Sequence, residues 1–400
     1  MPVLVVYNPV CGNSTAGAFF DEHVFPLLRS SSTAIDEVVC TENVGHAGTA
    51  VISFLETHDG DVTIILGSGD GTLHEIINAL SLVTLKGVRE NKPASPIRLA
   101  LVPCGTANAL YSSFFPPDTD IENPSYRLRS VKAFLAGSGA VPLTLAFTTL
   151  SSPPAPTVKR PQVTVSAVVT STALHASILH DSESLRKEIP GIDRFKVAAR
   201  NNITQWYNSY VKLLPIPSVG VVQIYDPDTN SFLPHEDSDE DNPIVDMYGP
   251  FAYFLSTVNV DRLEPAFCIS PVACSIPSKH PSLDIVIVRP ERDPTFDMDT
   301  REKRISFAEK AGMVLSAAYQ AGSHIKLRYG EDGTIHDRGR GPNVVEYIRC
   351  GGWEWIPDDV DDKAHLLCSD GAIFNIEKGG RAVCVAARPA ENTGFMIYIS

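Results

Sequence analysis

The chain lacks long hydrophobic runs and an excess of positive charge. Its longest apolar stretches, such as 3–7 and 97–102, are far shorter than the roughly 20 residues that span a bilayer. Lys and Arg total 33 against 47 Asp and Glu, so the net charge is −14 over 400 residues. An acidic surface repels phosphate backbones. We therefore expect no transmembrane helix and no nucleic-acid partner.

Cysteine motifs and targeting signals are also missing. The eight cysteines are scattered and form no CxxC pair, so we expect reduced thiols and no structural zinc. The strand-like run VLVVY at 3–7 starts without the basic segment of a secretory signal. Hydrophobic residues make up 44% and charged residues 20%, as in ordinary globular proteins. These features predict a folded cytoplasmic protein with room for two or three domains.

Residues 1–141 alternate two kinds of apolar pattern. Short β-rich runs lie at 3–7, 35–40, 62–66 and 97–102, and apolar positions at helical spacing lie at 16–28, 47–56 and 73–83. Alternating strands and helices are typical of a parallel, doubly wound sheet. We predict a Rossmann-like α/β domain over 1–141.

From residue 142 to residue 400 the pattern changes to strands without regular helices between them. The runs lie at 143–150, 163–171, 218–225, 253–258, 282–288, 324–329, 344–350, 372–376 and 381–387. They predict an antiparallel, β-rich domain, with the Pro/Ser segment 151–162 as a surface loop. Residues 203–214 place Trp206 and Tyr210 on one apolar face at helical spacing, which either packs in the core or lines an acyl-chain pocket.

Three small-residue loops follow predicted strands of the first domain. In VTIILGSGDGTLHEIINAL at 62–80, an apolar strand enters a glycine-rich turn that opens into an amphipathic helix. Such turns expose backbone N–H groups that attract anionic oxygens, although they also serve packing alone. Strand 3–7 ends in NPVCGN, and strand 97–102 ends in PCGTANAL. Because parallel strands end at one sheet edge, the three loops predict a nucleotide-sized anionic site.

Two common nucleotide signatures do not match. The P-loop pattern GxxxxGK[ST] is absent, and a dinucleotide GxGxxG would need glycine where Thr72 stands. The remaining distinctive residue is Asp70, a carboxylate inside the phosphate-binding turn. It would contact a magnesium ion, accept the proton of an attacking hydroxyl, or cap the helix that begins nearby.

These segments resemble the diacylglycerol kinase catalytic superfamily, and most closely its sphingosine kinase and ceramide kinase branch. GSGDGTLHEIINAL is similar to the family's GGDG signature. The other similar segments are VVYNPVCGN at 5–13, TENVGHA at 41–47, LVPCGTANAL at 101–110, SILHDSESLR at 177–186 and LLCSDGAIF at 366–374.

The resemblance implies an N-terminal α/β domain like that of phosphofructokinase and NAD kinase, a C-terminal β-sandwich, and binding of ATP, Mg²⁺ and a lipid. It implies Asp70 as the catalytic base toward the lipid hydroxyl. It places ATP near Asn8, Thr41, Ser68, Gly69, Gly71, Thr72, Glu75, Gly105, Thr106, Asn108, Arg186 and Arg194. Asp370 would bind the metal, and Leu179, Asp181, Trp206 and Tyr210 would lie near the lipid. For the two arginines, a surface ion pair with a neighbouring acid is the alternative.

Three residues depart from the family pattern. Ala372 stands where the late D-G-E motif has glutamate, which would weaken a metal site. Leu179 stands where sphingosine kinases place an aspartate for the lipid amine. Ala107 replaces a glycine, adding a methyl group where backbone approaches nucleotide.

The sequence therefore predicts a lipid kinase that phosphorylates a hydroxyl of a sphingoid base, ceramide or diacylglycerol-like lipid. A nucleotide- or lipid-binding pseudo-kinase with a regulatory role and an NAD kinase-like enzyme are the alternatives. The expected partners are the lipid substrate and, transiently, a membrane surface, for which Phe114 and Phe115 are candidate contacts. The sequence does not give the oligomeric state.

Overall fold

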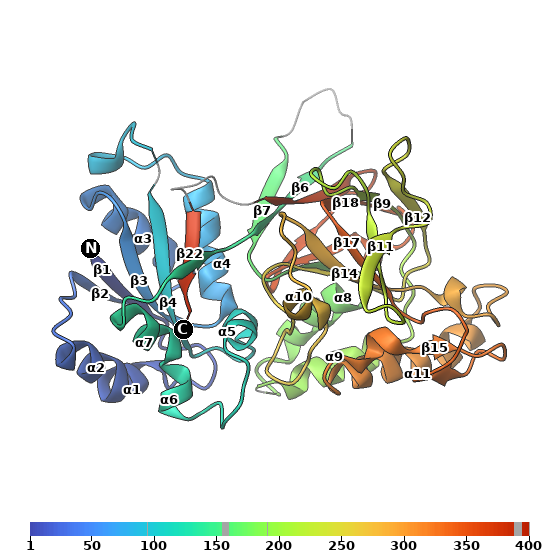
Figure 1. Cartoon of the computed structure of the whole chain (residues 1–400), viewed down its shortest axis with the longest axis horizontal. Coiled ribbons are helices and arrows are strands. Elements are labelled where there is room, and N and C mark those ends of the chain that lie inside the picture. Colours follow the sequence, from blue (N-terminus) through green and yellow to red (C-terminus); the bar gives the residue numbers. More distant parts are fainter. Residues whose placement is uncertain (94, 154–159, 190, 388–393, 400) are drawn as a thin grey trace. The chain divides into compact units, whose positions relative to one another are not determined.

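The computed structural model describes residues 1–93, 95–153, 160–189, 191–387 and 394–399. The chain divides into two compact units (Figure 1). The first contains Met1–Leu145 and Arg388–Ser400, and the second contains Ala146–Ala387. Among the described residues, no helix combines the length and apolar content needed to cross a membrane.

The first unit is built on a six-stranded sheet with the strand order β2-β1-β3-β4-β22-β5. Its strands are β1 (Val3–Tyr7), β2 (Glu37–Cys40), β3 (Val62–Ser68), β4 (Pro96–Pro103), β5 (Ala140–Pro142) and β22 (Gly394–Tyr398). The pairs β2–β1, β1–β3, β3–β4 and β4–β22 are parallel, whereas β5 pairs antiparallel with β22. The predicted parallel sheet is confirmed.

Helices cover both faces of this sheet. They are α1 (Ala16–Phe19), continuing through a π-helical turn (Phe20–Val24) into α2 (Phe25–Ser30), then α3 (His46–Thr57), α4 (Asp70–Ser81), a 3₁₀ turn (Gly87–Arg89), α5 (Ala109–Phe114), α6 (Pro124–Arg127) and α7 (Arg129–Leu135). Val5 and Ile65 pack with Phe20 and with Val131 of α7 in one core cluster. Since side chains alternate along a strand, the intervening residues face α3 and α4, which contact β1 and β3. The sheet is therefore doubly wound, as predicted.

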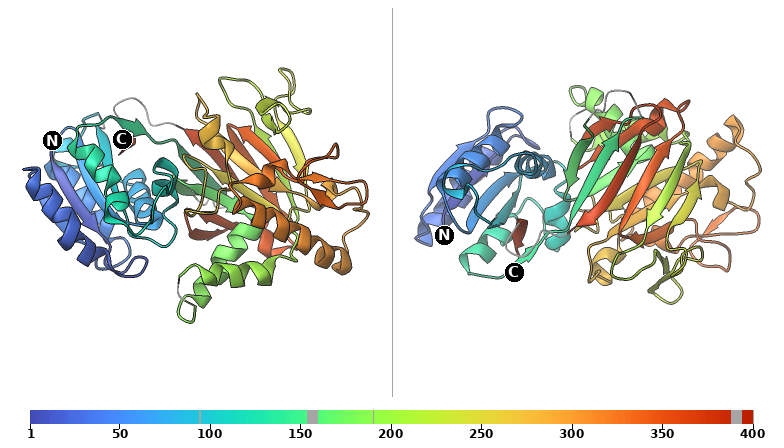
Figure 2. Two further views of the ribbon diagram at one scale, coloured as in Figure 1. Left: turned by 60° about the horizontal axis from the view of Figure 1, so that its bottom comes forward. Right: turned by 90° about the horizontal axis from the view of Figure 1, so that it is seen from above.

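The second unit contains two larger antiparallel sheets (Figure 2). One has the order β11-β10-β17-β14-β13-β8-β19-β20, the other has β12-β9-β18-β21-β6-β7, and β15-β16 form a small ribbon. The strands are β6 (Leu145–Ser151), β7 (Gln162–Ser166), β8 (Val169–Thr172), β9 (Ser209–Leu214), β10 (Gln223–Asp226), β11 (Ser231–Pro234), β12 (Val245–Tyr248), β13 (Tyr253–Thr257), β14 (Leu283–Val288), β15 (Arg328–Tyr329), β16 (Ile335–His336), β17 (Glu346–Cys350), β18 (Gly352–Pro357), β19 (Leu366–Ser369), β20 (Ala372–Asn375) and β21 (Arg381–Ala387).

Aromatic side chains join these two sheets into a sandwich. Phe254 of β13 lies 5.4 Å from Trp353 and 5.2 Å from Trp355 of β18, measured between ring centroids. Trp353 Nε1 donates a 3.0 Å hydrogen bond to Ser256 Oγ of β13. Both tryptophans are fully buried. Large aromatic groups in such a core contribute much of the apolar burial, so the predicted sandwich has its centre here.

Helices occur in the second unit where none was predicted. They are α8 (Ala173–Leu185), α9 (Asp193–Asn202), α10 (Val272–Ser275) and α11 (Arg301–Ala318), with 3₁₀ turns at Pro290–Arg292, Ser323–Lys326 and Asp362–His365. α8 packs against α9 and against β8, β13 and β19. The expectation of strands without regular helices was therefore wrong for these segments, and the strand expected at 324–329 is reduced to β15.

The prediction of a helix over 203–214 was also wrong. This segment contains β9, whose residues alternate between buried and partly exposed positions. β9 pairs with β12 and β18 on its two sides. Its apolar residues fit both a period of 3.6 and a period of 2, and the available strand partners decide in favour of the strand.

The predicted division into 1–141 and 142–400 differs from the compact units at the C-terminus. β22 pairs with β4 and β5 in the first sheet, and Phe395 and Ile397 are buried there. A short apolar run carries no local signal for which of two sheets it joins. The sequence pattern therefore did not predict that the C-terminal strand pairs in the sheet of the first unit. Of the predicted surface loop 151–162, residues 154–159 lie outside the described residues.

Candidate active site

The three small-residue loops lie side by side at the carboxyl ends of β1, β3 and β4. Asn8 N donates to Gly67 O at 2.9 Å, and Cys104 N donates to Ser68 O at 3.0 Å, so the strand pairing continues into the loops. Asn8 Nδ2 also donates to Thr72 Oγ1 at 3.3 Å. The structure therefore brings the loop after β1 against the start of α4, as the sequence predicted.

Gly69 and Gly105 hold the loops after β3 and β4 in direct backbone contact. A Cβ atom on Gly105 would lie 2.4 Å from Gly69 Cα, and one on Gly69 would lie 2.9 Å from Gly105 Cα. No larger residue fits either position without moving the facing backbone. A Cβ on Gly71 would meet nothing within 4 Å, so packing does not demand glycine there.

Asn108 closes the loop after β4. Its Oδ1 accepts from Gly105 N at 2.8 Å, and its Nδ2 donates to Gly105 O at 2.9 Å. The residue has φ +52°, a left-handed conformation that asparagine tolerates better than most residues. Thr106 is exposed within this closed turn. Asn108 thus gives the loop a defined shape from which Thr106 can meet a ligand.

Asp70 is the first residue of α4, and its carboxylate accepts hydrogen bonds from the backbone of α5. Oδ2 accepts from Ala109 N at 2.8 Å and Oδ1 accepts from Leu110 N at 3.1 Å. Asp70 therefore caps α5 rather than its own helix. These two bonds orient the carboxylate relative to α5. The half-buried carboxylate also borders a cavity of about 20 Å³ between β3, β4 and α5, which is the size of one water molecule.

Three further predicted residues make internal contacts near the loops. Glu75 Oε1 accepts from Gly48 N at 3.2 Å, which ties α4 to α3. Ser68 is buried, and its Oγ donates to Gly69 O at 3.0 Å. Thr41 is buried after β2. These contacts position the loops, so their role at a ligand would be to hold the backbone in place.

Arg127, which the sequence did not single out, forms hydrogen bonds to the loop after β4. Its Nε donates to Pro103 O at 3.1 Å and its Nη2 donates to Cys104 Sγ at 3.3 Å. The guanidinium lies 3.8 Å from the centroid of the Phe19 ring. Arg127 is buried at the end of a short helix, and no motif in the sequence marked it.

The predicted phosphate arginines lie in the second unit and differ in exposure. Arg186 is exposed and forms a 3.1 Å ion pair with Glu183, which is the surface alternative expected from the sequence. Arg194 is buried, its Nη1 donates to Gly191 O at 2.7 Å, and its guanidinium stacks on Phe195. Burial, with the nearby charge of Arg186, lowers the pKa of Arg194. Arg186 retains the freedom to reach a ligand, whereas Arg194 is held by the protein.

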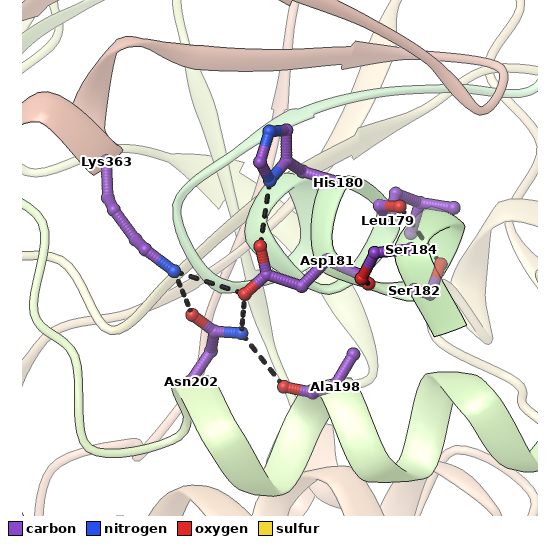
Figure 3. A network of polar contacts seen from close by, with 8 residues as sticks. All are labelled: Leu179, His180, Asp181, Ser182, Ser184, Ala198, Asn202 and Lys363. Atoms are coloured by element: carbon purple, nitrogen blue, oxygen red, sulfur yellow. Dashed lines mark hydrogen bonds and ion pairs between the residues drawn. The ribbon is translucent and has the colours of Figure 1, made fainter. Parts of the chain in front are cut away.

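Asp181 is the centre of a polar network between α8 and α9 (Figure 3). Its Oδ2 accepts from Asn202 Nδ2 at 2.7 Å and from Lys363 Nζ at 3.2 Å, and its Oδ1 lies 2.8 Å from His180 Nδ1. Lys363 Nζ also donates to Asn202 Oδ1 at 2.6 Å. Burial alone would raise the pKa of Asp181, but the hydrogen bonds from these three side chains hold it below its ordinary value.

Leu179 packs among apolar side chains rather than in this network. It contacts a cluster of Ala176, Leu366 and Cys368, together with Ile373. Two residues that the sequence assigned to the lipid therefore have different surroundings, because Leu179 joins a hydrophobic cluster and Asp181 is surrounded by polar donors.

Asp370 lies in the turn between β19 and β20, and its carboxylate contacts the backbone that connects β7 to β8. Its carboxylate accepts from the backbone N–H groups of Ala167, Val168 and Val169 at 2.7, 2.9 and 2.8 Å. Within the described ranges, no group of three or more His, Cys, Asp or Glu side chains is placed to hold a metal ion. These donors do not fit the magnesium role that the sequence gave to Asp370, and we derive no step through a metal.

Trp206 and Tyr210 do not share a helical face. Trp206 is buried between Phe296 and Phe307, with ring centroids 5.9 and 5.8 Å away. Tyr210 lies on β9, stacks on Tyr248 at 5.0 Å and donates to Asp246. The pattern that suggested an acyl-chain pocket is therefore absent. Phe115, a predicted membrane contact, is likewise buried.

Comparisons with known proteins agree with the geometry of the first unit. Residues 2–134 match the model of the diacylglycerol kinase catalytic domain. Human sphingosine kinase 2 is 29% identical over 156 residues, which cover 38% of this chain and 22% of that protein. Sphingoid long chain base kinase 5 of Saccharomyces cerevisiae is 35% identical over 126 residues, which cover 31% of this chain and 16% of that protein. These matches thus span less than a quarter of either relative.

Solved structures with the same fold come from Bacillus anthracis str. Sterne. A diacylglycerol kinase from that organism has a TM-score of 0.50 and 12% identity, covering 100% of this chain and 97% of its own. A related structure reaches a TM-score of 0.53, also at 12% identity, and covers 95% of its own chain. At this identity the likeness concerns the fold alone. Residues 2–134 are therefore similar to the diacylglycerol kinase catalytic domain, and about a third of the chain is similar to sphingosine kinases.

Proposed function

We propose that the protein is an ATP-dependent lipid kinase that phosphorylates a hydroxyl group of ceramide, a diacylglycerol-like lipid or a sphingoid base. The observation that carries the proposal is the convergence of the loops after β1, β3 and β4. Their contacts, from Asn8 to Thr72 and from Gly69 to Gly105, create one continuous backbone surface at a sheet edge. Backbone N–H groups at such an edge suit the anionic oxygens of a triphosphate.

In this proposal the loops bind the phosphates and Asp70 receives the proton of the attacking lipid hydroxyl. The bonds from Ala109 and Leu110 fix the carboxylate before substrate arrives, so orientation costs little during the reaction. Thr106 and Asn108 would contact the nucleotide from the loop after β4. The family resemblance also assigns Arg186 and Arg194 to phosphates, and a guanidinium suits that task.

The surroundings of Leu179 and Asp181 favour a neutral lipid headgroup. At Leu179 an amine would meet an apolar cluster instead of a counter-ion. Asp181 is already hydrogen-bonded to Asn202, Lys363 and His180, so an amine would have to displace a lysine ammonium to pair with it. Burying an unpaired ammonium is costly. We therefore expect ceramide or a diacylglycerol-like lipid to be a better substrate than a sphingoid base.

The test is transfer of labelled γ-phosphate from ATP to a panel of sphingosine, ceramide and diacylglycerol in mixed micelles, with NAD as an additional acceptor. We expect a labelled neutral lipid as the main product. Labelled NAD without labelled lipid would support the NAD kinase alternative instead.

A pseudo-kinase remains the second candidate because Ala372 replaces the glutamate of the late motif and Asp370 is bound by backbone N–H groups. Equilibrium binding of ATP, measured on the same preparation, separates the two. Measurable ATP binding with no labelled acceptor would favour the pseudo-kinase.

A further inference from the structure

Two cysteines meet where the loop after β1 touches the loop after β4. A Cβ atom built on Gly12 would lie 2.3 Å from Cys104 O, so the backbones of the two loops are in direct contact. Cys104 is buried in the core cluster of the first unit, and the half-buried Cys11 packs against the same cluster. Residues 93 positions apart in sequence thus place two thiols on facing loops.

The two thiols have different polar partners. Cys11 Sγ lies 3.0 Å from Asn8 O, to which its S–H can donate. Cys104 Sγ accepts a 3.3 Å hydrogen bond from Arg127 Nη2. Arg127 is buried and fixed by its bond to Pro103 O, so a positive charge lies permanently beside Cys104.

This arrangement makes the pair chemically unequal. The interaction with the Cys11 thiol, followed by the charge of Arg127, lowers the pKa of Cys104 despite its burial. The same interaction, together with burial, raises the pKa of Cys11. The thiolate is the reactive form of cysteine. Cys104 is therefore the better nucleophile, and Cys11 is the resolving thiol, which reacts second.

We propose that Cys11 and Cys104 are a site of reversible oxidation, at which a hydroperoxide converts the two thiols into a disulfide that ties the loop after β1 to the loop after β4. The inference rests on the geometry of the first unit and does not require the proposed kinase activity. If that activity is present, the disulfide joins two of the three loops that would hold ATP.

The chemistry balances in two steps. The Cys104 thiolate attacks the terminal peroxide oxygen, an S–O bond forms, the O–O bond breaks, and hydroxide leaves to become water in the case of hydrogen peroxide. Cys11 sulfur then attacks the sulfenic sulfur of Cys104, the S–S bond forms, and the S–O bond breaks. The departing oxygen takes the Cys11 proton and leaves as water. Two thiols lose two electrons, the peroxide gains them, and a dithiol reductant reverses the process.

The first test is peptide mapping after treatment of the whole chain with about one equivalent of hydrogen peroxide. We expect the Cys11–Cys104 disulfide as the main product, with loss on addition of dithiothreitol. Cys40→Ser is the matched control, because Cys40 is an exposed cysteine of the same unit, and it should leave the product unchanged. A denatured sample oxidised in parallel should give mixed pairings. A main product that pairs Cys11 or Cys104 with any other cysteine would overturn the proposal.

The second test traps the sulfenic acid with dimedone. In Cys11→Ser the resolving thiol is missing, so the dimedone adduct at Cys104 should exceed that of the wild type at least about tenfold. In Cys104→Ser, the adduct at Cys11 should remain low. If either variant fails to fold, peptide mapping of the wild type still tests the proposal. Recovery of the Cys11 and Cys104 peptides as unmodified thiols, after all of the peroxide has been consumed, would contradict it.

Discussion

Replacing Asp70 by asparagine separates its structural contact from its proposed chemistry. The side chain keeps its size, but only one of its two terminal atoms can accept a backbone N–H. Either Ala109 N or Leu110 N then faces an amide group and loses its partner. Hydrogen bonds to a charged group contribute about 1.5 to 3 kcal/mol. We expect Asp70→Asn to lower the free energy of unfolding by about 2 kcal/mol.

The proposed chemistry predicts a much larger effect on turnover. Loss of a positioned general base typically lowers the rate by about 10² to 10⁴, which corresponds to roughly 3 to 5 kcal/mol in the activation barrier. Domains are commonly stable by at least about 5 kcal/mol, so a loss of about 2 kcal/mol leaves about 1% of the molecules unfolded. Unfolding therefore cannot produce a hundredfold loss of kcat.

The assay measures kcat, ATP affinity and the urea midpoint for wild type and Asp70→Asn. We use Thr300→Ala as the matched control, since Thr300 caps α11 of the second unit by accepting from Lys303 N at 3.2 Å. That variant should lose about 1 kcal/mol of stability with little change in kcat. Equal kcat values for wild type and Asp70→Asn would refute the assignment of the base and leave Asp70 as a cap of α5.

Three other substitutions test the structure at different places. Gly105→Ala should lower ATP affinity at least about tenfold, because its methyl group would meet backbone at 2.4 Å, whereas Gly139→Ala meets nothing within 4 Å and should bind ATP normally. Burial lowers the pKa of His324 from 6.5 to about 4, so the folded protein binds fewer protons than the unfolded one between these values. Stability should therefore fall as pH drops from 6.5 to 4, by up to about 3 kcal/mol for this group, and urea titrations of His324→Gln should show a smaller fall. Lys363→Met removes a donor that lowers the pKa of Asp181. The loss of stability, under about 1 kcal/mol for a partly exposed pair, should be present at pH 6 and should vanish as the pH falls through the lowered pKa of Asp181, which urea titrations can measure.

The first unit was predictable because its local patterns agree with its tertiary structure. β1, β3 and β4 are apolar runs followed by small-residue loops, and parallel strands must end at one edge. β22 was not predictable in the same way. Its five residues resemble any edge strand, and only the open position beside β4 decides where they pair.

The segment 203–214 shows the converse case, in which a strong local pattern gives the wrong element. Aromatic and aliphatic residues at mixed spacing satisfy a helix about as well as a strand. β9 forms because β12 and β18 supply hydrogen-bonding partners on both edges. Tertiary pairing thus overrides local periodicity, and the acyl-chain pocket inferred from the helix disappears with it.

Asp70 and Asp370 show which property of a carboxylate a sequence motif does not predict. Asp70 and Asp370 are each followed by glycine, and a motif assigns chemistry to each. The structure distinguishes them by their surroundings. Asp370 is buried and accepts three backbone N–H groups of one turn, so its acceptor positions serve the connection between β7 and β8. Asp70 is half-buried and accepts two backbone N–H groups from α5, beside the loops after β3 and β4. Because exposure and donor number come from residues distant in sequence, the chemical difference between two similar D-G motifs becomes visible only when the folded backbone is known.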